Sequence, residues 1–163
     1  MTWSALINAT AAALAPRVTA AGGTLEVAQS LAEARAFLEA APNRWRLILH
    51  WEGFSGNAKA RYGMTTHKVA TVIQQRKTLA VKPGDALTHT SPSGEPSIAE
   101  RIQTVIEWMC AMQFPDGTSA DVAGFVLSDS QWLETLPNFQ AHAISWELDA
   151  AIPPYNQKIA LTF

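Results

Sequence analysis

Residues 45–51, with the sequence WRLILHW, constrain the fold of this chain more than any other segment. Side chains alternate along it, so an extended backbone would carry Trp45, Leu47, Leu49 and Trp51 on one face and Arg46, Ile48 and His50 on the other. A period of two is the signature of a strand with one buried face. We therefore expect a half-buried strand here.

Three helices are predicted around this strand. The first begins at Thr2, has apolar residues at steps of three and four, should be bent or ended by Pro16, and stops at Gly22 and Gly23. Capping boxes of the form S-x-x-E begin the second helix at Ser30 and the third at Ser97, and the third ends over residues 114–117. The apolar positions predicted to face inward are Leu31, Ala34, Leu38 and Ala41 in the second helix, and Ile98, Ile102, Val105, Ile106, Met109 and Met112 in the third.

Further strands and two long loops complete the pattern. Residues 67–81 form an extended stretch that would span ~50 Å at ~3.3 Å per residue, so part of it must bend, bulge or project from the body. Strands are also predicted over residues 124–128 and 139–152, and Pro153 and Pro154 end the latter because neither can donate to a ladder. Glycine, serine and proline mark loops over residues 53–66 and 82–96.

This order of elements predicts an α+β fold. We expect a mixed or mainly antiparallel sheet of about four to five strands, two to three helices packed on one face, and long loops between strands. A chain of 163 residues suits one domain, residues 1–163, in which residues 155–163 form a C-terminal arm.

Composition excludes several functional classes. Charged residues make up only 16% of the chain, against a typical ~25%, and 28 residues are alanine. A weakly charged surface suits a subunit that buries much of that surface against copies of itself. The net charge of −2 excludes a strongly basic nucleic-acid binder, and the single Cys110 excludes a disulfide framework. No apolar run reaches ~20 residues and no basic leader precedes one, so we expect a cytosolic chain with no membrane partner.

The charges are segregated along the chain. Residues 44–82 carry eight basic residues and one acidic residue, Glu52, a net charge of +7. Residues 83–149 carry ten acidic residues and one basic residue, Arg101, a net charge of −9. Such zones could join identical subunits head to tail into a ring, or could neutralise each other inside each subunit. In a third interpretation, Lys59, Arg61 and Arg76 line a lumen through which DNA passes unread.

No catalytic, cofactor-binding or metal-binding residues are predicted. The histidines, at positions 50, 67, 89 and 142, are scattered, and the GFSGN sequence of residues 53–57 has Asn57 where a nucleophile elbow needs glycine. Glu147 and Asp149 share one face of the last strand, ~7 Å apart, but an acidic rim on an edge strand explains them more simply than paired catalytic carboxylates do. Cys110 is expected to be a buried, inert thiol.

The six tryptophans fall into two groups. Trp45, Trp51, Trp108 and Trp146 are expected in the core, because they lie on predicted inward faces. Trp3 and Trp132 lie near an end and a turn, and we expect them to be exposed anchors, since tryptophan is enriched at interface hot spots.

The pattern resembles that of the tail terminator (tail completion) proteins of long-tailed bacteriophages and related prophages. An N-terminal helix is followed by the strand at 45–51, a glycine-rich loop, the TVIQQ sequence at 71–75 and the helix at 98–112. The closing strand AISWELD at 143–149, with Ile152, Pro153 and Pro154 after it, is the most family-like stretch. The loop at 82–97 is longer than that of the family.

The resemblance implies a non-enzymatic virion component that forms a hexameric ring. Such a ring caps the growing tail tube, ends its polymerisation and presents a surface to the head–tail connector protein, so the implied partners are copies of the chain, the tail tube protein and the connector. The implied location is the head-proximal end of the tail, and the host cytoplasm during assembly. No cofactor is implied, and DNA would pass through the lumen without specific recognition.

The charge zones and the C-terminal arm suggest which residues form the subunit or tube interface. The expected residues are Lys59, Arg61, Lys68, Arg76 and Lys77 in the basic zone, Glu147 and Asp149 in the acidic zone, and Ile159, Leu161 and Phe163 in the arm. These last three alternate, so the arm could lie along the sheet edge of an adjacent subunit.

Two alternatives stay open. The chain could be a head–tail connector or another neck protein, which shares ring geometry and differs in its partner. It could also be a small ligand-binding or hydrolytic α+β domain, which a pocket with a polar cluster around His50 or His67 would favour.

Overall fold

The computed structural model describes residues 3–56, 64–76, 94–115, 122–133 and 139–151. The helices are α1 (Trp3–Ala20), α2 (Leu31–Glu39) and α3 (Ile98–Cys110). The strands are β1 (Thr24–Ala28), β2 (Trp45–Gly56), β3 (Met64–Arg76), β4 (Gln113–Pro115), β5 (Val122–Gly124), β6 (Val126–Leu133) and β7 (Phe139–Ala151). No helix in these ranges has the length and apolar character needed to cross a membrane.

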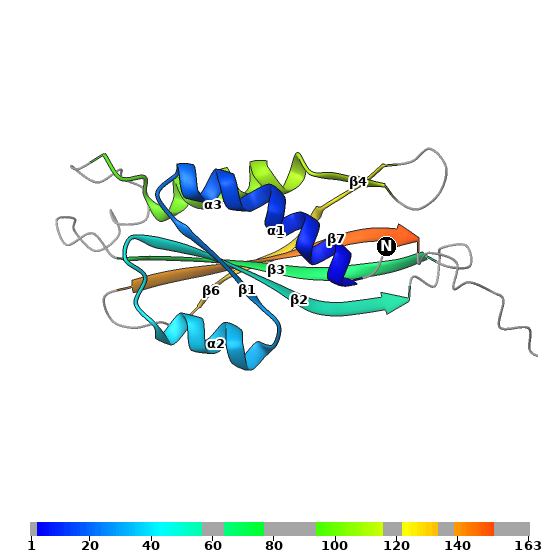
Figure 1. The fold of residues 1–163 in the computed structure, drawn as a ribbon, viewed down its shortest axis with the longest axis horizontal. Helices are drawn as coiled ribbons and strands as arrows, with labels where there is room; N and C mark the ends of the chain where they lie inside the picture. Colours follow the sequence, from blue (N-terminus) through cyan, green and yellow to red (C-terminus); the bar gives the residue numbers. More distant parts are fainter. Residues whose placement is uncertain (1–2, 57–63, 77–93, 116–121, 134–138, 152–163) are drawn as a thin grey trace, which may run out of the picture.

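A five-stranded mixed sheet forms the centre of the molecule, in the order β1-β2-β3-β7-β6 (Figure 1). β1 runs parallel to β2, and every other neighbouring pair in this sheet is antiparallel. β4 and β5 form a separate two-stranded sheet. The predicted α+β fold is therefore confirmed.

Helices lie on both faces of the sheet. α1 and α3 cover one face, where the large core lies, and α2 packs over a smaller cluster on the other face (Figure 1). Two helices thus share a face, as predicted, while α2 departs from the expected one-sided arrangement. The prediction of which α2 residues face inward is also partly wrong, because Leu31 is 58% exposed and Ala41 lies beyond the helix. α2 packs through Ala34, Phe37 and Leu38.

The alternation predicted for residues 45–51 is confirmed, but the expectation of a half-buried strand is wrong, because α2 covers the second face and leaves Arg46 9% exposed and Ile48 fully buried. The side chains of Trp45, Leu47 and Leu49 are buried in the large core, and Ile48 belongs to the cluster under α2. Trp146 is also fully buried, while Trp51 and Trp108 are half-buried against the large core.

β2 is longer than predicted and β3 begins earlier, because each extends into the expected loop over residues 53–66. β2 continues to Gly56 and β3 begins at Met64, and the two remain paired up to Gly56 opposite Thr65. Glu52 is an extra residue in a bulge, and Gly53 follows it with a φ of 131°, which costs glycine little. Cross-strand pairing outweighs the weak strand propensity of this segment. The end of the predicted stretch, residues 77–81, lies outside the described residues.

Several element ends differ from the predictions. α1 continues through Pro16 to Ala20, so the proline does not end it. The capping box at Ser97 is present as predicted, but α3 ends at Cys110, and residues Gln113–Pro115 form β4 instead of a last helical turn. β6 occupies Val126–Leu133 rather than residues 124–128. β7 agrees with its prediction to within a residue.

Candidate interaction surfaces

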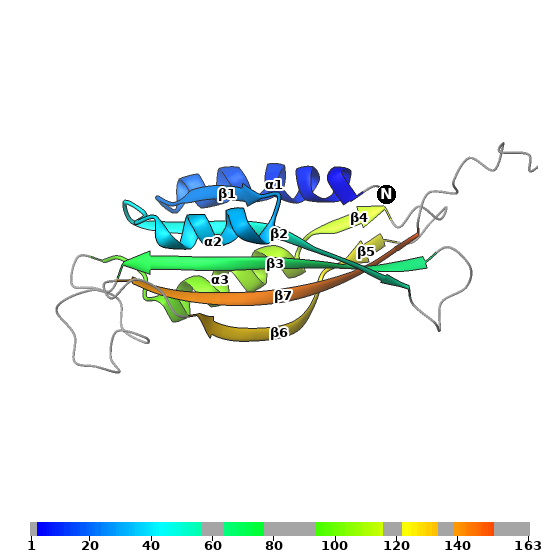
Figure 2. The ribbon, with the colours of Figure 1, turned by 90° about the horizontal axis from the view of Figure 1, so that it is seen from below.

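Strand β6 forms one edge of the sheet (Figure 2). It carries exposed apolar side chains. Val126 is 66% exposed, Leu127 42% and Trp132 51%. In the described part of the chain these are three of the four large apolar residues that are exposed. Asp129 is the strand's one charged residue. An apolar edge of this kind is the usual mark of a protein contact.

Trp132 is held in place by His142 on the neighbouring strand. The two residues are paired in the β6–β7 register, and their rings meet edge to face with centroids 4.6 Å apart. His142 is buried, and burial lowers its pKa from the ordinary value. Trp132 is therefore exposed, as predicted, but also oriented by a buried neighbour. The side chain of Trp3 lies outside the described residues.

The three central strands continue past both edge strands. β1 pairs with β2 only as far as His50, and β6 pairs with β7 only as far as Glu147. β2 continues to Gly56, β3 begins at Met64 and β7 continues to Ala151, so residues 51–56, 64–69 and 147–151 form what we call the sheet extension. Figures 1 and 2 show these strand ends reaching past β6, α2 and α3.

One face of the sheet extension is polar. Lys68 and Glu147 are register partners on β3 and β7, and Lys68 Nζ lies 3.6 Å from Glu147 Oε1. The next pair along, Thr66 and Asp149, is joined by a hydrogen bond from the Thr66 hydroxyl to the carboxylate. Ser128 of β6 also donates to Glu147, over 3.4 Å. Side-chain contacts thus link neighbouring strands of the extension.

The structure brings together only some of the predicted interface residues. Lys68, Glu147 and Asp149 meet on the sheet extension, whereas Arg76 is exposed at the opposite end of β3. The two acidic residues differ in their place: β6 pairs with β7 at Glu147, whereas Asp149 lies past the last such pair, where β7 is an outer strand of the sheet extension. The remaining six predicted residues, Lys59, Arg61, Lys77, Ile159, Leu161 and Phe163, lie outside the described residues.

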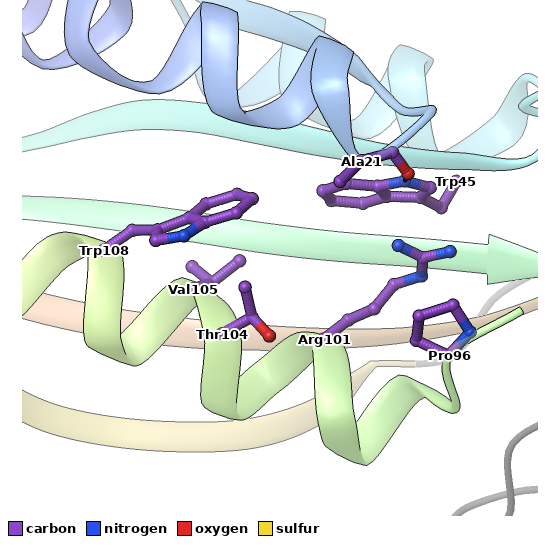
Figure 3. Close-up of a pocket in the computed structure, with 7 residues that line it drawn as sticks. All are labelled: Ala21, Trp45, Pro96, Arg101, Thr104, Val105 and Trp108. Atoms are coloured by element: carbon purple, nitrogen blue, oxygen red, sulfur yellow. Dashed lines mark hydrogen bonds between the residues drawn. The ribbon is translucent and has the colours of Figure 1, made fainter.

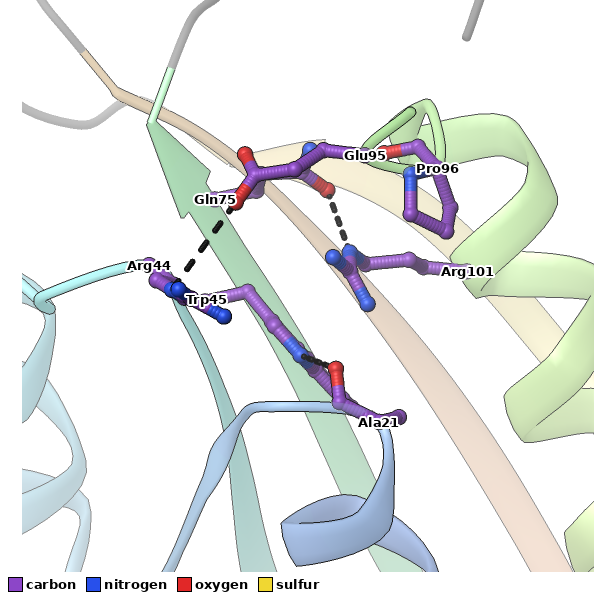
Figure 4. A network of polar contacts seen from close by, with 7 residues as sticks. All are labelled: Ala21, Arg44, Trp45, Gln75, Glu95, Pro96 and Arg101. Carbon is purple, nitrogen blue, oxygen red and sulfur yellow. Dashed lines mark hydrogen bonds and ion pairs between the residues drawn. The ribbon is translucent and has the colours of Figure 1, made fainter. Parts of the chain in front are cut away.

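Two ion pairs join the basic zone to the acidic zone within one subunit. Besides Lys68 and Glu147, Arg44 Nε lies 4.0 Å from Glu95 Oε1 at the other end of the sheet (Figure 4). Both pairs are substantially exposed, so each contributes little to stability. They favour neutralisation inside the subunit for these four charges.

α3 carries a buried arginine, Arg101, which its sequence pattern did not single out as a site. Arg101 is 6% exposed; its Nε donates to Gln75 Oε1 over 2.9 Å, and its guanidinium carbon lies 4.5 Å from the centroid of the Trp45 ring (Figure 4). Burial lowers the pKa of Arg101, and the negative charges of Glu95 and Glu100 act in the opposite direction. The position could have been noticed, since Arg101 falls between Ile98 and Val105 on the inward face of the helix.

Hydrogen bonds fix the neighbours of Arg101. Trp45 Nε1 donates to Ala21 O over 3.0 Å, and Gln75 Nε2 donates to Pro96 O over 2.9 Å. A Cβ on Gly23 would overlap the Trp45 ring, so this position requires glycine. A cavity of about 80 Å³ lies beside these groups (Figure 3), lined by Ala21, Trp45, Pro96, Arg101, Thr104, Val105 and Trp108. The cavity is small and Arg101 already contacts Gln75 and Trp45, so these residues fit a structural role better than a ligand site. They stabilise the packing of α1, β2, β3 and α3 against one another.

A larger cavity, of about 420 Å³, lies between α1 and β1. Its lining comprises Ser4, Ile7, Asn8, Val27, Ala28, Gln29 and Trp51. Neither His50 nor His67 lines it. His50 is on the α2 face with Nδ1 3.2 Å from Ala28 O, while His67 is buried on the α1/α3 face, where burial lowers its pKa. The two histidines therefore do not converge on one pocket.

Other predicted chemistry is also spread out. Within the described ranges no three residues of the types His, Cys, Asp and Glu gather as metal ligands. Cys110 is exposed at the end of α3, which corrects the expectation of a buried thiol, because the inward face of α3 passes through Met109 instead.

Comparison with protein-family models gives no match to this chain, and comparison with curated proteins gives no significant one.

Proposed function

We propose that this chain is a structural, non-enzymatic subunit of a phage or prophage virion. It acts as a tail terminator, forming a hexameric ring that caps the tail tube, ends tube polymerisation and joins the tail to the head connector. The ring stands at the head-proximal end of the tail after assembly in the host cytoplasm, and DNA crosses its lumen without sequence-specific contacts.

The sheet extension is the observation that carries this proposal. A part that reaches beyond the core can join neighbouring subunits around a cylinder, and the hydrogen bonds from β3 to β2 and to β7 hold such a part together. The extension outruns both edge strands, and its polar face presents Lys68, Glu147 and Asp149. Its strands include the segments that resemble tail terminator proteins.

Two further observations support an assembly role. The charged fraction of 16% is low, so burying a large part of the surface removes few charges from water. The exposed apolar residues of β6 offer a second contact surface, which adjoins the extension where Val126 pairs with Glu147. A head–tail connector would use the same two surfaces, and the two functions differ in which partner the ring binds.

The test polymerises a phage tail tube protein, alone and with the purified chain, and measures tube lengths by electron microscopy. With the chain present, we expect shorter tubes that carry the tagged chain at one end. Unchanged lengths and untagged tube ends would refute the terminator proposal, and binding to the connector protein alone would favour the connector.

A pair of charge swaps tests the extension itself. In Lys68→Glu/Glu147→Lys the ion pair within the subunit is kept while the charges that face a partner are exchanged. The matched control, Arg44→Glu/Glu95→Arg, does the same for the pair at the other end of the sheet. We expect the first swap to reduce tube capping and the control to leave it intact. Equal capping by both variants would remove the extension from the contact.

A further inference from the structure

We propose that β6 is a docking strand for β6 of a second copy of this chain. The two strands pair antiparallel about a two-fold axis that passes through Ser130, so the sheets of both copies join into one. The inference rests on the edge strand alone and is independent of the proposed tail function.

Of the features that protect edge strands from pairing, β6 carries one charged residue, Asp129, and a bulge at Ser128. Proline and lysine, which discourage pairing at an edge, are absent from its sequence, VLSDSQWL. The opposite edge of the sheet, β1, is only five residues long, contains Glu26 and is contacted by both α1 and α2. β6 is longer, and every residue from Val126 to Trp132 is exposed. Of the two edge strands of this sheet, β6 is therefore the less protected in the described part of the chain.

The strand is complementary to itself. Apolar pairs stand at its two ends, Val126 with Leu127 and Trp132 with Leu133, and polar residues lie between them. When such a sequence pairs antiparallel with itself, the apolar end of each copy meets the apolar end of the other. Both apolar contacts are made twice, as a two-fold axis requires.

The faces of the strand agree with this pairing. Register with β7 puts Leu127, Ser130 and Trp132 on the α1/α3 face, since they oppose Trp146, Ile144 and His142. Val126, Asp129, Gln131 and Leu133 fall on the other face, because the strand shifts register between Leu127 and Asp129. Ser128 is the extra residue in that bulge.

With Ser128 bulged in both copies, every opposed pair lies on a common face. Ser130 then opposes Ser130 of the second copy, and Trp132 opposes Leu127 of the second copy on the α1/α3 face. On the other face, Leu133 opposes Val126, and Asp129 opposes Gln131, each of the second copy. The one charged residue of the strand therefore meets an amide that can donate to it, and two aspartates never oppose each other.

The contact also completes the setting of Trp132. Its ring already meets His142 edge to face within one copy, and pairing would cover its exposed side with Leu127 of the second copy. An isologous contact closes at two subunits and cannot by itself form a six-fold ring. It belongs to the free chain, where it covers an apolar edge that would otherwise invite aggregation.

The experiment measures the oligomeric state of the purified chain by sedimentation equilibrium. We expect the wild-type chain to dimerise, and Ser130→Lys and Ser130→Glu each to weaken dimerisation about tenfold, because like charges then oppose each other on the axis. Mixing the two variants should restore a dimer that contains one copy of each. Thr19→Lys and Thr19→Glu, at an exposed position of α1, are the controls and should leave dimerisation unchanged.

Cross-linking gives a second readout that does not depend on charge. In a Cys110→Ser background, Ser130→Cys should form an intermolecular disulfide under mild oxidation, because directly opposed residues approach within disulfide range. Thr19→Cys in the same background should not. A wild-type chain that stays monomeric at every concentration, or a dimer that is insensitive to both Ser130 charges and fails to cross-link, would overturn the proposal.

Discussion

Replacing Thr71 by valine should destabilise the chain although it changes the shape of the side chain very little. Thr71 is fully buried on β3, and its hydroxyl accepts a hydrogen bond of 2.8 Å from Nε1 of Trp146, which is also fully buried. Valine fills nearly the same volume but cannot accept, so the indole N–H loses this bond inside the large core. The perturbation therefore isolates one polar contact between β3 and β7.

The expected loss is about 2 kcal/mol, because a buried donor left without its acceptor costs about 1–3 kcal/mol. With a urea m-value of about 2 kcal/mol/M for a domain of this size, the unfolding midpoint should fall by about 1 M. In a double-mutant cycle with Trp146→Phe, which removes the donor, the effect of Thr71→Val should shrink by at least about 1 kcal/mol.

The matched control is Thr10→Val in α1. Thr10 is also fully buried, but its hydroxyl donates to Leu6 O, over 2.8 Å, an oxygen that the helix backbone already satisfies. Removing this hydroxyl leaves no donor unpaired, so we expect a change within about 0.5 kcal/mol. If Thr71→Val costs no more than Thr10→Val in urea unfolding, the assigned role of the Trp146 hydrogen bond is wrong.

Two further predictions concern buried charge. Arg101→Met should lower the free energy of unfolding in urea by about 2 kcal/mol, because the contacts of the guanidinium with Gln75 and Trp45 are lost and the buried Gln75 Oε1 loses its donor. Removal of a buried charge offsets part of this loss. An unchanged midpoint would contradict the structural role of Arg101. Burial lowers the pKa of both His67 and His142 below the ordinary 6.5, so the unfolded chain takes up protons first as the pH falls. The free energy of unfolding should therefore fall as the pH drops from 6.5 towards 5.5, and His142→Gln should flatten this slope. A free energy of unfolding that rises over the same interval would refute the prediction.

Local patterns predicted the elements whose residues carry their own periodicity. The alternation over residues 45–51 and 139–152 and the capping box at Ser97 each matched the structure, because a buried face or a cap is written into adjacent residues. The sheet extension could not be found in this way. Residues 53–56 have weak strand propensity and are held as strand by pairing with β3, a contact that depends on the distant half of the hairpin.

Strand order and the choice of sheet face are also non-local. The sequence of β7 reads as a polar-faced strand whether it is central or at an edge, so it does not indicate that β6 flanks Glu147 and ends before Asp149. The alanine-rich α2 has an apolar side but nothing that says which face of the sheet it covers. In the structure it packs over Ile48 and Val72, on the face opposite α1 and α3.

The same non-locality limits what charge segregation can do for assembly. Lys68 belongs to the basic zone and Glu147 to the acidic zone, but β3 and β7 are adjacent along thirteen register pairs, so folding puts the zones side by side. Part of the electrostatic attraction between the basic and acidic zones therefore acts within each subunit, as between Lys68 and Glu147. The apolar side chains of β6 differ, because Trp132 and its neighbours on this strand are still exposed after the subunit has folded. For the dimer proposed above, the exposed apolar residues of β6 are thus a better guide than the net charges of the two zones.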